Sequence, residues 1–287
     1  IVNSNDLKKI QKVKLNEIKG MIESFTINEE KFIDEVYYLN LGVSFNKKKI
    51  FTYLEKKNIF PSLPNKKKFL FIPIIIEENS KDLLIFNNNE FFSNWNNYSE
   101  KSHLIDYILP TEDLEDINFI KKKYELIEKY DFKEITKKYS LDNSIIALIF
   151  KDKKEIRILS RITIRDDTVL KNQTFENFDI ENDENLEKLI KKLKTIYEDY
   201  WKDFNQINTS IKLTIYIKID NNDNNKITEF ENTLDKTELV YDFFISKFNK
   251  DYSYYQIVFN STPNIFLKIM KDNNYTFNTQ NKIWILE

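Results

Sequence analysis

The residues best suited to specific binding chemistry are the arginines. Of 44 basic residues only three are arginine, and they fall close together as Arg157, Arg161 and Arg165. A guanidinium group is planar and can donate two parallel hydrogen bonds to one carboxylate or phosphate, whereas an ammonium group acts as a point charge. Residues 155–165 have the pattern of a strand, in which side chains four and eight positions apart share a face. We therefore predict an arginine ladder that either binds an anion or an acidic partner, or pairs with the protein's own acids.

The densest acidic cluster is formed by Glu112, Asp113, Glu115 and Asp116. Two carboxyl groups held in a cleft are the machinery of glycoside hydrolysis, so a hydrolase that uses an acid pair is one interpretation. Acids in the first turn of a helix also complement its dipole and cap its amide groups. The cap is the favoured interpretation, and an ion pair with the arginine ladder is a third.

A second acidic stretch partly matches a calcium-binding loop, with oxygen ligands at Asp220, Asn222, Asn224 and Glu231. Asn225 stands where such loops carry glycine, and the preceding segment has the pattern of a strand rather than a helix. A turn with a helix N-cap explains the same residues. Calcium is kept only as a weak alternative, and we predict no other metal and no cofactor.

Other catalytic arrangements lack their residues. His103 is the only histidine and the chain has no cysteine, which removes multi-histidine metal sites, thiolate sites and disulfides. Gly20 and Gly42 are the only glycines, so a glycine-rich phosphate loop is excluded. The aromatic stretches at 91–95 and 252–255 suit either sugar stacking or, more simply, the core. We predict no catalytic residue.

Composition limits the class of protein. With 287 residues, 41% hydrophobic and 15% aromatic, the chain can bury the cores of two or three small domains. A net charge of −2 argues against a nucleic-acid binder. No apolar run is long enough for a transmembrane segment. Scarce glycine and abundant Lys, Asn and Ile are typical of an AT-rich genome. The chain starts at Ile1, which fits a removed signal segment or a trimmed sequence.

Hydrophobic periodicity predicts three units. Residues 1–60 suit a small α/β unit with a helix over 6–22, strands at 24–27 and 36–45, and a helix after Asn46. Residues 65–180 suit a central α/β domain that has some parallel strand pairing and ends in an antiparallel hairpin. Its expected strands lie at 69–76, 104–109, 144–150, 155–165 and 169–175, with a helix at 90–98 and helical segments from 113 to about 139.

Residues 182–287 suit a long helix, 182–205, followed by a β-α-β-β-α-β arrangement of the ferredoxin-like type. The expected strands are 211–219, 238–247, 252–259 and 282–286, and the helices are 226–234 and 263–272. The predicted fold class is therefore a multidomain α+β or α/β protein with a ferredoxin-like C-terminal domain.

Four short stretches carry a family resemblance: LGVSFN at 41–46, FLFIPIII at 69–76, LPTEDLED at 109–116 and YSLDNSIIAL at 139–148. In these the chain resembles an uncharacterised family of secreted proteobacterial proteins, described only as a domain of unknown function. The near absence of glycine departs from the family's loops. The resemblance implies export to the periplasm and a middle domain similar to the α/β modules of envelope proteins. It implies no catalytic residues.

From this resemblance we expect a periplasmic or secreted protein, although a cytoplasmic location stays open. The expected function is a non-enzymatic interaction or assembly factor with a protein partner in the cell envelope. The alternative is a binding protein for an anionic glycan or phosphate-bearing ligand through Arg157, Arg161 and Arg165. A hydrolase is the third possibility.

Overall fold

The computed structural model describes residues 1–100, 102–152, 155–176 and 179–287. The chain forms two compact units. Pro64–Trp201 makes the central unit, and Ile1–Leu63 joins Lys202–Glu287 in the terminal unit. Both units combine helices with sheets, as the predicted α+β multidomain class requires.

A mixed sheet forms the middle of the central unit. Its strand order is β4-β3-β6-β7-β8, and β5 also pairs with β3. β3 runs parallel to β5 and β6, whereas β6, β7 and β8 are antiparallel neighbours. The predicted combination of parallel pairing with a closing antiparallel hairpin is confirmed. The strands are β3 (Lys67–Glu77), β4 (Asp82–Leu84), β5 (Ile105–Ile108), β6 (Asn143–Lys151), β7 (Glu155–Ile164) and β8 (Asp167–Glu176).

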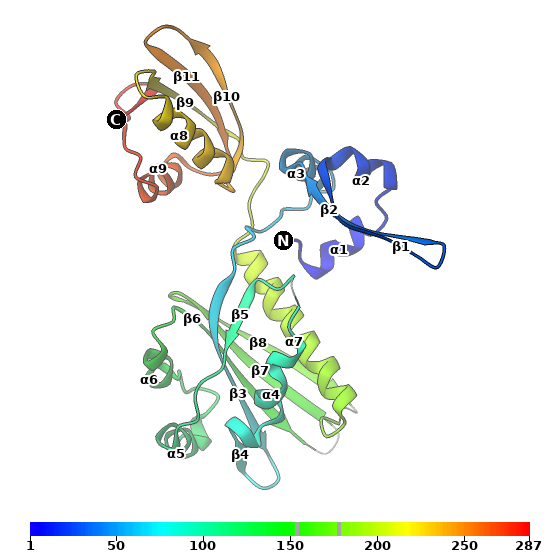
Figure 1. Ribbon diagram of the computed structural model, residues 1–287. Helices are drawn as coiled ribbons and strands as arrows, with labels where there is room; N and C mark the ends of the chain where they lie inside the picture. The colour runs from blue at the N-terminus through cyan, green and yellow to red at the C-terminus, as the bar shows by residue number, and fades with distance from the viewer. Residues whose placement is uncertain (101, 153–154, 177–178) are drawn as a thin grey trace. The chain divides into compact units, whose positions relative to one another are not determined.

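Helices cover both faces of this sheet (Figure 1). α4 and α7 lie on one face, and α5 and α6 lie on the other. The helices are α4 (Glu90–Asn94), α5 (Leu114–Lys122), α6 (Lys133–Thr136) and α7 (Asp183–Phe204), with 3-10 turns η1 (Phe86–Asn88), η2 (Trp95–Tyr98), η3 (Tyr124–Leu126) and η4 (Lys137–Tyr139). The predicted helical segments between 113 and 139 are α5, η3, α6 and η4.

The apolar runs of β3 and β6 reflect burial on both faces. On β6, Ile145 and Ile149 join the core beneath α7, while Ile146 and Leu148 join the core beneath α5 and α6. Successive side chains of a strand point to opposite faces, so a strand that is covered on both sides is apolar throughout.

Helix α7 belongs to the central sheet through most of its length. Its buried side chains include Leu186, Leu193 and Tyr197, which lie in one core cluster with Phe71 of β3. The sequence pattern groups residues 182–205 with the C-terminal domain and ends the central domain at 180. The structure places that division after Trp201, because the apolar stripe of α7 is buried against the central sheet.

The C-terminal part of the terminal unit is a sheet in the order β10-β11-β9-β13-β12. Helices α8 and α9 contribute Phe230, Leu234, Phe266 and Met270 to its core. The elements are β9 (Leu213–Asp220), α8 (Asn224–Lys236), β10 (Val240–Phe248), β11 (Tyr252–Phe259), α9 (Pro263–Asp272), β12 (Phe277–Asn278) and β13 (Ile283–Leu286).

This sheet departs from the predicted ferredoxin-like arrangement at its last strand. A split βαβ domain of that type has an all-antiparallel sheet, but β13 pairs with β9 in parallel. The extra strand β12 explains the reversal: it runs antiparallel to β13 at the edge and turns the chain around before β13 enters the sheet.

The N-terminal segment contains α1 (Ser4–Ile10), α2 (Leu15–Met21), β1 (Ile22–Ile33), β2 (Val36–Phe45) and α3 (Lys47–Lys56). The single helix predicted over 6–22 is instead two helices. Glu17 accepts a hydrogen bond from the Lys14 backbone amide at 3.0 Å, and this capping contact starts α2 anew. The segment contacts the C-terminal part through Thr52 and Tyr241, whose hydroxyl oxygens are 3.0 Å apart.

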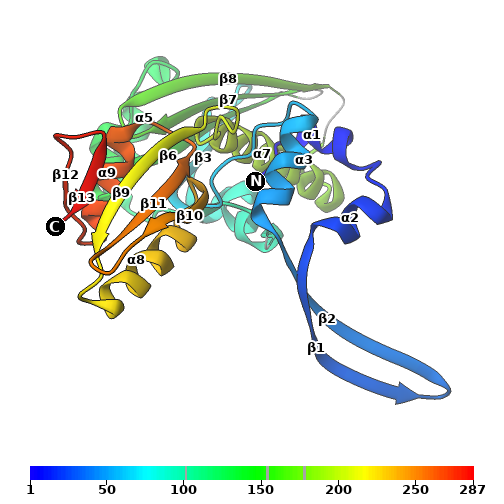
Figure 2. The same cartoon turned by 90° about the horizontal axis from the view of Figure 1, so that it is seen from above.

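Strands β1 and β2 pair only with each other in the part of the chain that the structure describes. They form a long antiparallel hairpin that extends away from α1, α2 and α3 (Figure 2). The predicted strand at 36–45 is confirmed, whereas the strand predicted at 24–27 extends over Ile22–Ile33.

Candidate functional site

Arg157 is stacked and paired within the central unit. It lies opposite Phe150 in the β6–β7 pairing, and its guanidinium carbon is 3.9 Å from the centroid of the Phe150 ring. Its Nη2 atom is 2.9 Å from Oε1 of Glu128. The guanidinium therefore neutralises an acid of the same unit.

Arg161 holds the same loop through its backbone. Its Nη2 atom donates a hydrogen bond to the carbonyl oxygen of Glu128 at 2.9 Å, and Nη1 donates to the carbonyl oxygen of Tyr130. A planar guanidinium can donate to two carbonyl groups at once in a way that an ammonium group cannot. Arg157 and Arg161 thus hold the segment after η3 against the sheet through an ion pair and hydrogen bonds.

The third member of the predicted ladder is not on the strand. β7 ends at Ile164, and Arg165 lies in the turn to β8 with a φ of 53°. Its backbone amide donates to the carbonyl oxygen of Asp142 at 2.9 Å. The prediction that all three arginines share one face is therefore wrong for Arg165, because the chain reverses direction one residue earlier.

The acidic cluster acts as a helix cap. Asp113 is the N-cap of α5, and its Oδ1 atom accepts from the backbone amide of Glu115 at 2.8 Å. Lys138 bridges Asp113 and the buried Asp116, with Nζ distances of 3.1 and 2.6 Å. The hydrogen bond from Lys138 lowers the pKa of Asp113. A glycosidase acid needs a raised pKa, so this arrangement does not favour acid catalysis.

The calcium-like loop is a capped turn. Asp223 is the N-cap of α8, and Asp220 accepts a hydrogen bond from the amide of Asn222 at 2.9 Å. Glu231 accepts from the hydroxyl of Tyr255 at 2.6 Å. Among the described residues, no group of three or more His, Cys, Asp or Glu side chains is placed to hold a metal ion.

The aromatic stretches belong mainly to the cores. Phe91 and Trp95 are fully buried, and the Trp95 ring stacks on Phe71 with centroids 3.8 Å apart. In the second stretch Tyr255 is buried, whereas the Tyr252 ring lies beneath the Lys218 amine. A sugar-stacking platform built from Phe91 and Trp95 would be inaccessible.

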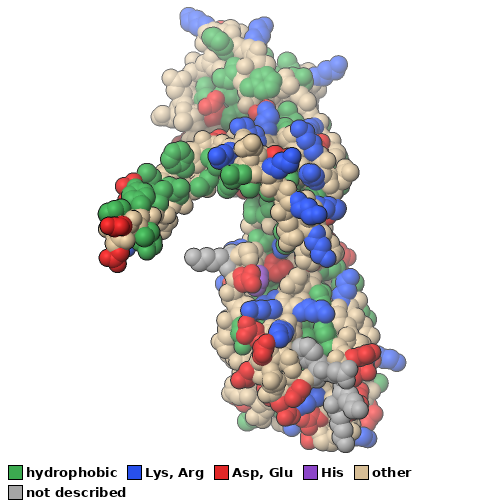
Figure 3. Space-filling view, turned by 90° about the vertical axis from the view of Figure 1, so that its right-hand side faces the viewer, with side chains coloured by type: hydrophobic (Ala, Val, Ile, Leu, Met, Phe, Trp, Pro, Cys, Tyr) green, Lys and Arg blue, Asp and Glu red, His purple; other side chains and the backbone are tan. Residues whose placement is uncertain are grey.

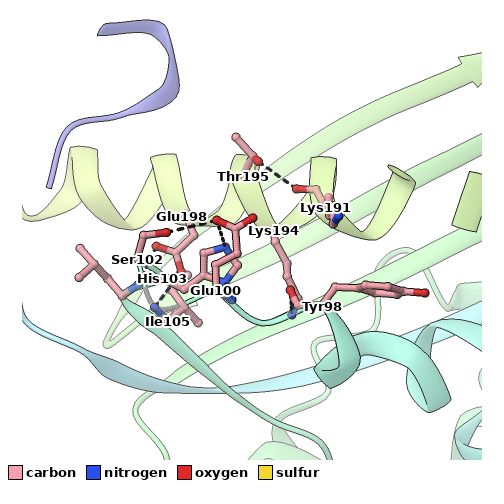
Figure 4. Close-up of polar contacts among 10 residues, drawn as sticks. Tyr98, Glu100, Ser102, His103, Ile105, Lys191, Lys194, Thr195 and Glu198 are labelled. Atoms are coloured by element: carbon pink, nitrogen blue, oxygen red, sulfur yellow. Dashed lines mark hydrogen bonds and ion pairs between the residues drawn. The ribbon is translucent and has the colours of Figure 1, made fainter. Parts of the chain in front are cut away.

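His103 lies in the loop before β5, close to a buried polar cluster that the sequence did not reveal (Figure 4). Its Nδ1 atom accepts from the amide of Glu100 at 3.3 Å. The adjacent open cavity of about 480 Å³ is lined by residues of mixed charge, including three lysines with Glu100 and Asp106.

Glu198 of α7 anchors the start of β5. Its buried carboxylate accepts hydrogen bonds from the backbone amides of Leu104 at 2.9 Å and Ile105 at 2.8 Å. Figure 4 shows the Glu198 side chain directed from the helix towards Ile105. The contact joins helix and sheet edge through a charge-assisted interaction.

Lys194 lies one helical turn before Glu198 and is also buried. Its Nζ atom donates to the carbonyl oxygen of Tyr98 at 3.1 Å and lies 5.3 Å from the ring centroids of both Trp95 and Tyr107. Burial lowers the pKa of Lys194 to about 8. Because its amine is enclosed by aromatic rings, we assign this cluster a structural role.

Among the residues that the structure describes, exposed hydrophobic side chains are concentrated on one face of the β1–β2 hairpin. Cross-strand partners share a face, so the pairing register places its hydrophobic side chains together. We call this surface the apolar hairpin face; it consists of Ile22, Phe25, Ile27, Phe32, Tyr37, Leu39, Leu41, Val43 and Phe45. All of these except Ile22 are exposed, and Phe25 and Phe32 reach 67% and 71%.

The opposite face is polar over its inner part. We call Ser24, Thr26, Asn40, Gly42 and Ser44 the polar hairpin face. Figure 3 shows hydrophobic side chains along the hairpin and acidic side chains at its tip. At that end, a hydrogen bond to the Glu30 carboxylate raises the pKa of Tyr37.

About half of this surface follows from the sequence. Tyr37, Leu39, Leu41, Val43 and Phe45 alternate along the predicted strand 36–45, but the other predicted strand covers only 24–27. A bulge between Ile27 and Glu29 shifts the register, so Phe32 falls out of the alternation that Phe25 and Ile27 begin. Beyond the bulge, Phe32 again lies on the apolar face, and this residue is the sequence signal that could have extended the predicted strand.

None of the described helices combines the length and apolar character needed to cross a membrane. Comparisons of the chain with protein-family models, with curated proteins and with solved structures find no match.

Proposed function

We propose that this protein is a non-enzymatic interaction or assembly factor, and that the apolar hairpin face is its binding surface. The observation that carries the proposal is the exposure of that face. An apolar sheet face normally packs against a second layer, and large exposed apolar patches mark interaction surfaces. A two-stranded hairpin is also marginally stable alone in water, so a partner would stabilise its strands.

The alternative function, anion binding through the arginine ladder, has less support. Arg157 and Arg161 already contact Glu128 and nearby carbonyl groups. An anion would have to displace these contacts. The hydrolase alternative has less support still, because Lys138 bridges the two acids that come together.

We further propose that the protein works in the cell envelope, in the periplasm or after secretion, as the family resemblance implies. We also propose that the C-terminal sheet is a variant of the ferredoxin-like arrangement. Its order β10-β11-β9-β13 corresponds to that of a split βαβ domain, and its added β12 would account for the reversed last strand. Sheets of this kind present one open face, which suits a scaffold for interactions.

Site-specific photo-crosslinking tests the proposed function with a matched control. Tyr37 and Tyr38 are adjacent tyrosines with exposed fractions of 57% and 54%, and they lie on opposite faces of the hairpin. A benzophenone side chain at position 37 should crosslink to protein in the producing cell, and one at position 38 should do so much less. Equal crosslinking from both positions, or none from position 37, contradicts the proposal.

A further inference from the structure

We propose that the apolar hairpin face binds the same face of a second copy of this chain, with the two hairpins antiparallel. This inference deepens the proposed function and rests on it, because it names the partner of the same surface. Three features of the hairpin carry it: the size of the apolar face, the distribution of charge along the hairpin, and the difference between its two faces.

The size of the face fits a stable dimer. The exposed fractions of its side chains correspond to roughly 800 Å² of surface, which is about what one partner buries in a standard-size interface. In the part of the chain that the structure describes, β1 and β2 pair with no third strand, and every side chain of this face except Ile22 is exposed. A two-fold symmetric contact uses the same patch on both copies, so each copy would supply the layer that the other lacks.

Charge gives the contact its direction. Residues 22–45 hold five acids and one lysine, for a net charge of −4, and most of these acids lie near the tip. The flanking residues 1–21 and 46–57 hold ten lysines and three acids, for a net charge of +7. The hairpin is therefore acidic at its free end and basic at its base.

Within one chain the two charged ends cannot meet. A strand advances about 3.3 Å per residue, so β2 alone separates tip and base by roughly 30 Å. An antiparallel second copy brings each acidic tip, where Glu30 lies on the apolar hairpin face, to the lysine-rich base of its partner, near Lys19 and Lys49. A parallel arrangement would instead place the two acidic tips together, which like-charge repulsion disfavours.

Packing through the faces is favoured over pairing through the strand edges. The polar hairpin face carries small and polar side chains that water can solvate, whereas the apolar face has only Glu30 among its hydrophobic residues. Edge pairing would leave the whole apolar face exposed in the dimer. Face-to-face packing removes it from water, and apolar burial is the dominant driving force for association.

Sedimentation of the full-length chain at rising concentration tests the association. The wild type should form dimers at micromolar concentration, and the double variant Phe25→Ser/Leu41→Ser should weaken the dimer about a hundredfold. The control Ser24→Ala/Ser44→Ala changes the polar face and should leave the dimer unchanged. All four positions are on the hairpin surface, so circular dichroism should show every variant folded. A wild type that stays monomeric at about 100 μM overturns the inference.

Single cysteines test the geometry, since the chain has no cysteine of its own. Leu41 lies near the middle of the apolar face, and its neighbour Asn40 lies on the polar face. Leu41→Cys should give a disulfide-linked dimer on mild oxidation, and Asn40→Cys should stay monomeric under the same conditions. Equal crosslinking at both positions would indicate edge pairing and would overturn face-to-face packing.

Charge reversal tests the antiparallel direction. Glu29→Lys/Glu30→Lys should weaken the dimer about tenfold at low salt, and Lys19→Glu/Lys49→Glu should do the same. Combining the four changes in one chain should restore affinity, because tip and base meet only between copies. Failure to restore it contradicts the antiparallel arrangement. A monomeric protein whose position 37 crosslinks to a different protein overturns this inference alone, whereas absence of any crosslink removes the proposed function as well.

Discussion

Phe25 and Val43 lie directly opposite each other across the β1–β2 hairpin, and both side chains face solvent. An aromatic paired with a β-branched residue stabilises two strands locally, but it buries little area without a covering layer. The pair is therefore suited to contact with another molecule more than to holding the terminal unit together.

Replacing Phe25 should cost little stability in dilute protein. We expect Phe25→Ser to change the free energy of unfolding by less than about 0.5 kcal/mol, as is usual for exposed positions. The control Ile257→Ala removes a fully buried side chain of the same unit and should cost about 2–5 kcal/mol. Urea denaturation at submicromolar protein measures both. A large loss at Phe25 would mean that the ring is already buried within one chain.

The arginines offer a second matched comparison. Arg161→Lys should destabilise the central unit by about 1–2 kcal/mol, because an ammonium group cannot donate to the Glu128 and Tyr130 carbonyl groups in the same planar way. Arg165→Lys, in the exposed turn, should change stability by less than about 0.5 kcal/mol. Thermal unfolding of the two variants distinguishes these outcomes, and equal effects would remove the special role of Arg161.

Lys194 gives the central unit a pH dependence. Its pKa is about 8 in the folded chain, below the ordinary 10.5, so the folded state loses this proton at lower pH than the unfolded state does. The free energy of unfolding should therefore rise from pH 8 to pH 10.5, by on the order of 2–3 kcal/mol. Below pH 8 both states hold the proton and the cost of burying the charge stays constant.

The variant Lys194→Met isolates this effect from other groups that titrate above pH 8. Subtracting its stability curve from that of the wild type should leave a rise confined to the same pH range. The neighbouring groups Glu198, Glu100 and Tyr107 are present in both proteins. Parallel curves for wild type and variant would show that the Lys194 amine is not desolvated.

Glu198 should be far more important to stability than an exposed acid of the same helix. Glu198→Gln removes the charge that binds the buried amides of Leu104 and Ile105, and should cost about 2–3 kcal/mol. Glu187 forms an exposed ion pair with Lys191, so Glu187→Gln should cost no more than about 0.5 kcal/mol. Chemical denaturation provides the measurement, and a similar small cost for both would contradict the anchoring role.

Much of the central unit could be predicted from sequence because its signals are strong and local. The continuous apolar runs of β3 and β6 predict strands covered on both faces, and the pattern of residues 155–164 predicts a strand with Arg157 and Arg161 on one face. The predictions that were wrong depended on backbone geometry and packing, which hydrophobic periodicity does not encode. Arg165 has a positive φ, and strand β7 ends before this third arginine. The apolar stripe of α7 indicates that the helix is buried, but it does not identify the sheet against which the helix packs.

The hairpin was predicted only in part for a similar reason. The bulge after Ile27 interrupts a period-two pattern, so the resumed alternation at Phe32 was not assigned to the same strand. The buried pair of Lys194 and Glu198 had no signal in sequence at all. Four residues apart on a helix, they read as an exposed charged pair, and only the packing of η2 and β5 over them reveals the burial.

Hydrogen exchange of the hairpin amides tests most directly whether the apolar hairpin face is a binding surface. An uncovered two-stranded hairpin should exchange rapidly, since its amides open locally with little cost. We predict that amides in residues 22–45 of the wild type become protected at high protein concentration or in extract of the producing cell, and that Phe25→Ser/Leu41→Ser abolishes the protection. Rapid exchange of the wild-type hairpin under all of these conditions would contradict the account.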